Sequence, residues 1–299
     1  MGSRNSKTLT RDGVSKLIKG TDGVKIMIQE HKEIMNMNVK GTFTAAITTG
    51  CLETTRKDAE RLCFDHSRVV LSEETGTNSY INASYINGFN RPKAYITTTT
   101  PDSEETICNY WKMIWEHQTK IIVTFQESED SVDGISYWNP EVGSTLQFGK
   151  LRIETYRIIN NHPSFQITNL LIKDEDEHTL FVYQFLFTKW QQVNISPPPS
   201  EFIDLLFMVR VYNQSSGEPV SLEGYNSPMV VHCSDGLRRS MVFCAIDIAI
   251  SSISETGEVN LYSIVSKLRK DKYNCLYKVN DYCFCYIAVY HYITFHRTV

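Results

Sequence analysis

Several features that mark membrane, secreted or nucleic-acid-binding proteins are scarce in this sequence. No apolar run reaches the length of a membrane span, and no secretory signal peptide is visible. The 299 residues carry a formal net charge of −4, which argues against a chain built mainly to bind nucleic acid. No internal repeat or low-complexity linker divides the chain. We therefore expect one domain, although the length alone would allow two.

Cysteine pairs with the spacing of a zinc site are also absent. Eight cysteines lie mostly inside apolar segments, at positions 51, 63, 108, 233, 244, 275, 283 and 285. This distribution indicates reduced thiols and a cytoplasmic protein. Cys283 and Cys285 fall in a tyrosine- and phenylalanine-rich segment, where core packing explains them better than metal binding. Neither a metal site nor a cofactor is expected.

The clearest chemical pattern surrounds Cys233. A β-branched run that ends at Cys233 predicts a buried strand, and the apolar segment Met241–Ile250 predicts a buried helix. Arg239 lies between them, six positions after the cysteine. A loop at a helix N-terminus can bind an anion through its N–H groups, and it can lower the pKa of a thiol. Arginine can hold two phosphate oxygens at once. The alternative, a structural cysteine with a surface arginine, stays open on spacing alone.

Periodicity and turn residues predict the other elements. We expect helices between residues 12 and 57, and one at Ser103–His117 where a serine–glutamate start fits a capping box. Val69–Ile96 should be rich in strands and Leu151–Phe187 should form a meander. Further helices are expected at Phe202–Tyr212, Ser263–Arg269 and Asp281–Thr294.

The segment His-Cys-x5-Arg-Ser, between strand and helix, resembles the signature loop of the protein tyrosine phosphatases. The resemblance runs from about residue 25 to the end and favours the phosphotyrosine-specific branch. Its other matching segments are Asp65–Leu71, Tyr80–Ile86, Ala94–Ile96, Trp111–Glu116, Tyr137–Trp138 and Phe284–Tyr286. It implies a single α/β domain at 25–299, with a twisted mixed sheet flanked by helices. Residues 1–24 would be a disordered or lipidated leader.

The resemblance also implies roles for the residues of this loop. Cys233 would be the nucleophile, Arg239 the phosphate clamp and Ser240 the hydroxyl that assists departure of the thiolate. The residues around the phosphate would be Ser234, Asp235, Gly236, Leu237, Arg238 and Arg239. Two of them differ from the family, which usually has alanine at 235 and glycine at 238.

Asp235 is expected to weaken an anion site. A carboxylate beside a bound dianion costs on the order of 4 kcal/mol per charge pair, at about 4 Å and an effective dielectric of about 20. It would also oppose ionisation of Cys233. Two alternatives stay open, namely that Asp235 points to solvent and that Arg238 partly offsets its charge. An inactive receptor branch of the family resembles this chain in having aspartate there.

Three more family positions have changed. Gln192, two residues after the retained Trp190, replaces the aspartic acid that protonates the leaving group, and loss of a general acid costs roughly 10²–10⁴ in rate. The family has a tyrosine that stacks on the phenyl ring of phosphotyrosine. It aligns with Asp58 in an ungapped match and with Leu62 in a gapped one, and neither can stack as tyrosine does. Asp281 replaces the glutamine that places water, which adds a carboxylate near the expected phosphate.

These changes together predict a pseudophosphatase, a catalytically impaired or inactive protein that modulates phosphotyrosine signalling by binding. The expected partners are phosphotyrosine-containing or other signalling proteins. One alternative is a slow but genuine phosphatase, a phosphoric monoester hydrolase with a Cys233–phosphate intermediate, for which Asp204 could substitute as the acid. Another is a protein-binding module that does not use the pocket.

The N-terminus and the eroded motifs refine this hypothesis. Met1–Ser6 fits the N-myristoylation pattern with Gly2 as the acceptor, and nearby basic residues would supply a second membrane signal. A disordered leader or a cloning remnant is the alternative. The Met-Gly-Ser start and the degenerate site resemble phosphatase-like proteins of polydnaviruses (bracoviruses). That resemblance implies interference with host immune-cell signalling in the host cytoplasm, with peripheral membrane contact through the N-terminus.

Overall fold

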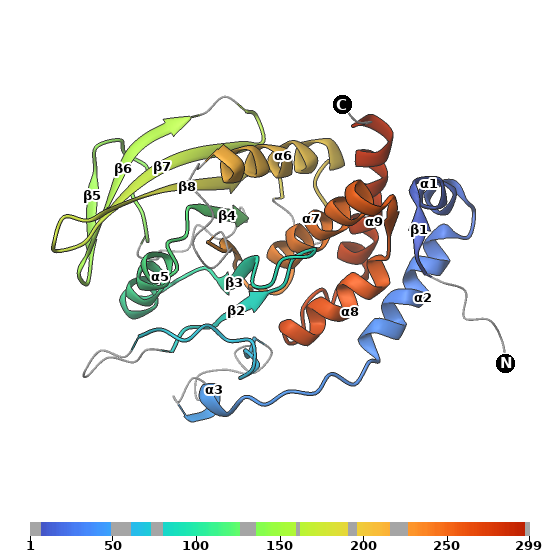
Figure 1. Ribbon diagram of the computed structural model, residues 1–299, viewed down its shortest axis with the longest axis horizontal. Helices are drawn as coiled ribbons and strands as arrows, with labels where there is room; N and C mark the ends of the chain where they lie inside the picture. Colours follow the sequence, from blue (N-terminus) through green and yellow to red (C-terminus); the bar gives the residue numbers. More distant parts are fainter. Residues whose placement is uncertain are drawn as a thin grey trace.

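The computed structural model describes residues 7–48, 61–72, 80–125, 136–159, 162–190, 196–215 and 227–296. Figure 1 shows a large twisted mixed sheet with helices on both faces, which is the α/β arrangement predicted from the sequence. A second, two-stranded sheet joins β1 (Leu9–Thr10) to β10 (Glu258–Val259). Among the helices of these ranges, none combines the length and the apolar character that crossing a membrane requires.

The large sheet places the strand that ends at Cys233 near its centre. Its spatial order is β2 (Ala83–Ile86), β3 (Tyr95–Thr99), β9 (Met229–Cys233), β4 (Ile121–Phe125), β8 (Thr179–Phe187), β7 (Phe165–Lys173), β6 (Leu151–Ile159) and β5 (Thr145–Phe148). The strands β3, β9, β4 and β8 are parallel to their neighbours in this series. The predicted meander is confirmed as the antiparallel strands β6, β7 and β8.

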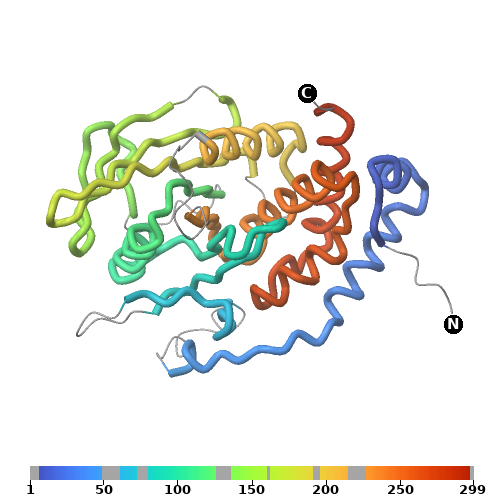
Figure 2. The backbone as a smooth tube through the Cα atoms, in the orientation of Figure 1, coloured from blue at the N-terminus to red at the C-terminus, as the bar shows by residue number. Residues whose placement is uncertain are grey.

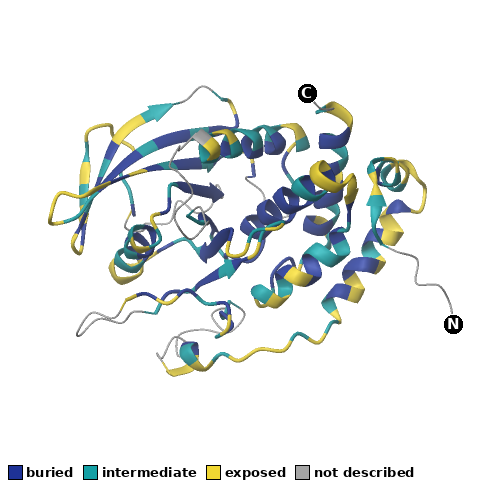
Figure 3. Ribbon diagram, viewed as in Figure 1, coloured by how far each residue is buried: buried dark blue, intermediate teal, exposed yellow. Residues whose placement is uncertain are grey.

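The central strands β4 and β9 are buried along their whole length and are mostly apolar, because both of their faces are covered. On one face, Val230 and Ile122 pack in a core with helix α5 (Glu104–Glu116). On the other face, Val231 and Val123 pack in the larger core. That core is shared with helices α6 (Pro199–Ser215), α7 (Arg239–Thr256), α8 (Leu261–Asp271) and α9 (Val279–Phe295). Figure 3 shows α7 buried along most of its length, as its apolar sequence predicts.

The N-terminal helices pack on the outside of α9 and α8. They are α1 (Arg11–Lys19) and α2 (Gly23–Met35), and a short α3 (Thr44–Thr48) follows. The predicted helical region is thus interrupted, because residues 36–43 are not helical and the chain runs on from α2 toward β2 (Figure 2). Strand β1 and helix α1 fall within residues 1–24, where a leader was predicted, and Val14 of α1 is buried in the larger core. Glu30 of α2 accepts hydrogen bonds of 2.8 Å from the hydroxyls of Tyr282 and Tyr286 in α9.

Helix α5 begins where the sequence predicts, but its cap differs in one residue. Ser103 accepts a hydrogen bond from the N–H of Thr106, and the Thr106 hydroxyl accepts one of 2.9 Å from the N–H of Ser103. Threonine, rather than a glutamate, therefore completes the capping box. The predicted helix at Met241–Ile250 begins two residues earlier, so Arg239 lies in the first turn of α7.

Candidate active site

The loop from Cys233 to Ser240 connects the end of β9 to the start of α7. Gly236 makes the tight turn of this loop possible. Its φ is +64°, and a Cβ at this position would lie 2.9 Å from the backbone carbonyl of Thr98 in β3. Glycine permits both the left-handed backbone at this position and the close approach of the loop to β3. Because the loop follows β9, it lies at the carboxyl end of the parallel strands.

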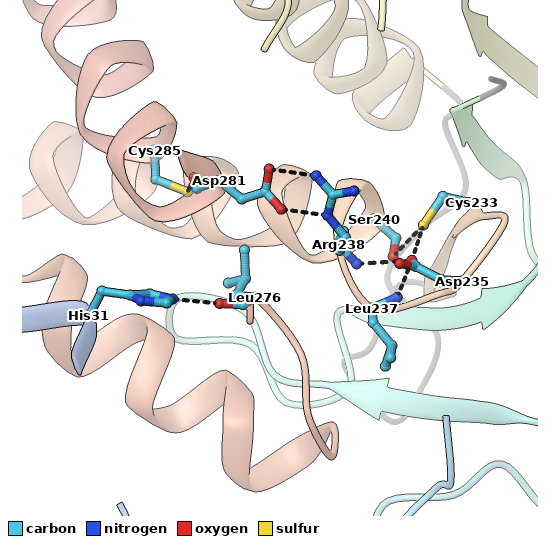
Figure 4. Close-up of polar contacts among 9 residues, drawn as sticks. All are labelled: His31, Cys233, Asp235, Leu237, Arg238, Ser240, Leu276, Asp281 and Cys285. Carbon is cyan, nitrogen blue, oxygen red and sulfur yellow. Dashed lines mark hydrogen bonds and ion pairs between the residues drawn. The ribbon is translucent and has the colours of Figure 1, made fainter. Parts of the chain in front are cut away.

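Asp235 directs its carboxylate into this loop rather than toward solvent (Figure 4). One oxygen, Oδ1, accepts hydrogen bonds from the N–H groups of Leu237 at 2.9 Å and Arg238 at 3.2 Å. The Cys233 thiol donates to the same oxygen at 3.3 Å. Converging loop N–H groups of this kind form an anion site. The Asp235 carboxylate thus takes up two N–H donors of the loop, which resolves the orientation that the sequence left open.

Cys233 is 1% exposed, and its surroundings keep it protonated. Burial and then the charge of Asp235 raise the pKa of the thiol to about 11, against the opposing hydrogen bonds of Ser240, whose hydroxyl lies 3.4 Å from Sγ. At pH 7 a thiol with this pKa is ionised only to about 10⁻⁴. Because the thiolate is the nucleophile, attack on a phosphate is strongly disfavoured here.

Arg238 forms a bidentate ion pair with Asp281, and its charge also interacts with that of Asp235. Its Nε and Nη2 atoms lie 2.9 and 3.2 Å from the two carboxylate oxygens of Asp281, in the first turn of α9 (Figure 4). The two residues are 6% and 2% exposed. Burial disfavours the charge of Arg238, but the hydrogen bonds and charge of Asp281 outweigh it and raise the pKa of the guanidinium. Asp281 is therefore part of a buried ion pair, not an uncompensated carboxylate beside the expected phosphate.

Arg239, the expected phosphate clamp, contacts the tryptophan of the expected acid loop. The centre of its guanidinium lies 5.5 Å from the centroid of the Trp190 ring, a cation–π geometry. Both side chains are buried. Trp190 also packs edge-on against Phe125 and Phe202. The arginine and the tryptophan of the family pattern are thus brought together.

The structure brings only some of the residues singled out from the sequence into this loop. Asp58, Gln192 and Gly2 fall outside the described residues. Leu62 is partly buried. Asp204, the alternative acid, lies on α6 with its carboxylate 3.7 Å from Nε2 of His162.

The residues behind the loop brace it through hydrogen bonds to backbone carbonyls. The connection between α8 and α9 contributes the N–H of Leu276, which donates to the carbonyl of Leu237 at 2.9 Å. Nε2 of His31 in α2 lies 2.9 Å from the carbonyl of Leu276. Sequence analysis missed this bracing, because hydrogen bonds between distant backbone segments leave no local pattern.

His232 supports the strand below the loop. Its Nε2 lies 2.7 Å from the hydroxyl of Thr124, and its Nδ1 lies 3.2 Å from that of Thr100. Burial lowers the pKa of His232 to about 3, so the ring is neutral.

Potential metal ligands gather elsewhere in the described ranges, in the exposed turn between β7 and β8, where Asp174, Asp176 and His178 lie close together.

Comparison with known proteins gives consistent matches along the chain. A family model described as "Protein-tyrosine phosphatase" matches residues 53–291. "Tyrosine phosphatase H2" of Microplitis demolitor bracovirus (isolate Webb) is 30% identical over 283 residues, covering 93% of this chain and 86% of the relative. "Tyrosine phosphatase-like protein J1" of the same virus is 30% identical over 301 residues, covering 98% of each. Human "Tyrosine-protein phosphatase non-receptor type 9" is 32% identical over 273 residues, covering 87% of this chain and 45% of the relative.

Proposed function

Since this chain belongs to the protein-tyrosine phosphatase family, we propose that it is a pseudophosphatase, which keeps the family frame and acts by binding rather than by turnover. The observation that carries the proposal is the Asp235 carboxylate on the N–H groups of Leu237 and Arg238. A substrate phosphate would have to displace a group of its own charge sign that is already hydrogen-bonded. The same carboxylate helps to keep the Cys233 thiol protonated. One side chain therefore opposes both substrate binding and nucleophilic attack.

The substitution of Gln192 adds to this proposal from the sequence side. An amide has no acidic proton to donate at neutral pH. Even if a phosphotyrosine reached Cys233, position 192 would supply no general acid to protonate the leaving tyrosine oxygen. Effects within one site do not simply add, but these changes act on different steps of the reaction.

The proposed role is to modulate phosphotyrosine signalling, in immune cells of a host. Two of the bracovirus relatives are named as a tyrosine phosphatase and a tyrosine phosphatase-like protein, and they align over nearly the whole of this chain. We place the partners among phosphotyrosine-containing and other signalling proteins of the host cytoplasm. Because the loop holds its own carboxylate, contacts with such partners would involve the surface around the loop more than the loop itself.

A turnover assay tests the proposal directly. The wild-type chain and the Cys233→Ser variant are incubated with a phosphotyrosine peptide, and released phosphate is measured, with an active phosphatase of the family as the positive control. We expect the two proteins to give the same background rate. Thiol-dependent hydrolysis by the wild type, abolished in Cys233→Ser, would contradict the proposal.

A slow genuine phosphatase is the second candidate. It is favoured by the Ser240 hydroxyl 3.4 Å from the Cys233 sulfur, the placement that assistance of thiolate departure requires. Under this alternative, the double variant Asp235→Ala, Gln192→Asp would raise a rate that is already measurable in the wild type. Under the pseudophosphatase proposal, any activity of the double variant would be new.

A further inference from the structure

A second buried cysteine, Cys63, has a lysine amine as its neighbour. Nζ of Lys272 lies 3.4 Å from the Cys63 sulfur and 3.4 Å from the hydroxyl of Ser84. The Cys63 thiol donates to the side-chain carbonyl of Asn82 at 2.8 Å. Cys63 and Lys272 are each 1% exposed. Among the described residues no carboxylate lies within ion-pair distance of Lys272, so this buried amine is held by a thiol and a hydroxyl.

The surroundings of the other described cysteines differ from this arrangement. The sulfur of Cys233 faces the carboxylate of Asp235 and the hydroxyl of Ser240, and neither group can condense with an oxidised sulfur as an amine can. The thiol of Cys285 donates to a backbone carbonyl. Within the described part of the chain, a hydrogen bond between cysteine and lysine side chains occurs at Cys63 alone. Cys63 and Lys272 therefore form a distinct chemical pair.

We propose that Cys63 and Lys272 are a redox-sensitive pair that forms a covalent sulfenamide cross-link when a peroxide oxidises the thiol. In the first step hydrogen peroxide transfers one oxygen to the sulfur, which gives sulfenic acid and water. In the second step the lysine nitrogen attacks the sulfur. The lysine ammonium releases one proton to solvent, and a second proton leaves with the sulfenic hydroxyl as water. The third proton stays on the nitrogen. Relative to the neutral side chains, the protein loses two hydrogens and gains a sulfur–nitrogen bond.

The cross-link would join two segments that lie 209 residues apart in the sequence. One is the segment that leads into Asp65, whose carboxylate accepts hydrogen bonds from the N–H groups of Thr44 and Ala45 in α3. The other is the connection between α8 and α9, whose Leu276 braces the Cys233 loop through Leu237. Oxidation at Cys63 would thus fix the backbone that supports the candidate active site without consuming Cys233.

Peptide mapping of the full wild-type chain tests this proposal. The reduced protein is treated with hydrogen peroxide, quenched with catalase, blocked with N-ethylmaleimide, digested with chymotrypsin and analysed by tandem mass spectrometry. We expect a linked pair of peptides, containing Cys63 and Lys272, that is lighter by two hydrogens than the sum of the separate peptides. Dithiothreitol should separate the pair, because thiols reduce sulfur–nitrogen bonds.

Two charge-preserving variants supply the controls. Lys272→Arg keeps a cation but removes the amine nucleophile, so we expect no linked peptide and further oxidation of Cys63 to sulfinic acid. Lys270→Arg, two residues away and exposed, should cross-link as the wild type does. The wild-type map remains decisive even if Lys272→Arg does not fold. Recovery of Cys63 as a free thiol, when the more exposed Cys108 and Cys283 are oxidised, would overturn the proposal, as would Cys63 recovered as unlinked sulfinic acid.

Discussion

The sharpest consequence of the structure concerns the change Asp235→Ala. In the wild type an entering oxyanion must displace a carboxylate that accepts two backbone hydrogen bonds, from Leu237 and Arg238. A hydrogen bond to a charged group contributes about 1.5–3 kcal/mol, so the displacement costs roughly 3–6 kcal/mol. At about 1.4 kcal/mol per factor of ten, removing Asp235 should strengthen oxyanion binding by roughly two to four decades.

Isothermal titration calorimetry with tungstate, a non-hydrolysable oxyanion, measures this effect. Asp235→Asn separates charge from occupancy, because its amide oxygen can still accept from the loop. We expect its affinity to lie between those of the wild type and Asp235→Ala. Glu175→Ala is the matched control, since it removes an exposed carboxylate in the turn between β7 and β8 and changes the net charge by the same amount.

Equal tungstate affinity in the wild type and Asp235→Ala would refute this reasoning. Such a result would mean that the carboxylate does not compete for the loop donors. A gain of the same size in Glu175→Ala would refute it in another way, because it would show that net charge rather than the filled loop controls binding.

Three further predictions follow from other contacts of the site. The rate of Cys233 alkylation by iodoacetamide should reach half its maximum near pH 11, and this midpoint should move to lower pH in Asp235→Ala. Because folding raises the pKa of the thiol from 9.0, the stability that Cys233 contributes should be complete below about pH 9 and should fall as the pH rises toward 11. Arg238→Gly or Asp281→Gln alone should each lower the free energy of unfolding, measured in urea, by about 3–5 kcal/mol, because each leaves one buried charge without its partner. The double variant should recover part of that loss, and additive losses would contradict the ion pair. Gly236→Ala should lower the unfolding free energy by about 1–3 kcal/mol, since the left-handed backbone and the Thr98 carbonyl both exclude a Cβ; an unchanged urea midpoint would be inconsistent with the loop geometry.

The fold was largely predictable because its strongest signals are local. A β-branched run that ends at Cys233 and an apolar run that follows are sufficient to place β9 and α7 on either side of the loop. The meander was equally clear from alternation along Leu151–Phe187. At the N-terminus the helical periodicity extended over α1, but the expectation of a leader at residues 1–24 missed the packing of α1 and Val14 on the larger core and α9.

The site was predictable in composition but not in geometry. The sequence identified Asp235, Arg238 and Asp281 as departures from the family, but the only charge compensation that it suggested was between Arg238 and Asp235. The structure pairs Arg238 with Asp281 across 43 positions, and the Asp235 carboxylate accepts hydrogen bonds from the loop. Two opposite charges at changed family positions could have suggested such a pair. The direction of the Asp235 side chain depends on loop backbone geometry, which no local pattern specifies.

The central claim is that the loop donors are already occupied in the wild-type protein. The amide signal of Leu237, in a chain labelled with ¹⁵N-leucine and assigned with Leu237→Met, reports on one of these donors directly. During titration with inorganic phosphate we predict that this signal stays unchanged while the Asp235→Ala variant shows a saturating shift. A saturating shift of the Leu237 amide in the wild type, at phosphate concentrations that saturate the variant, would contradict the account.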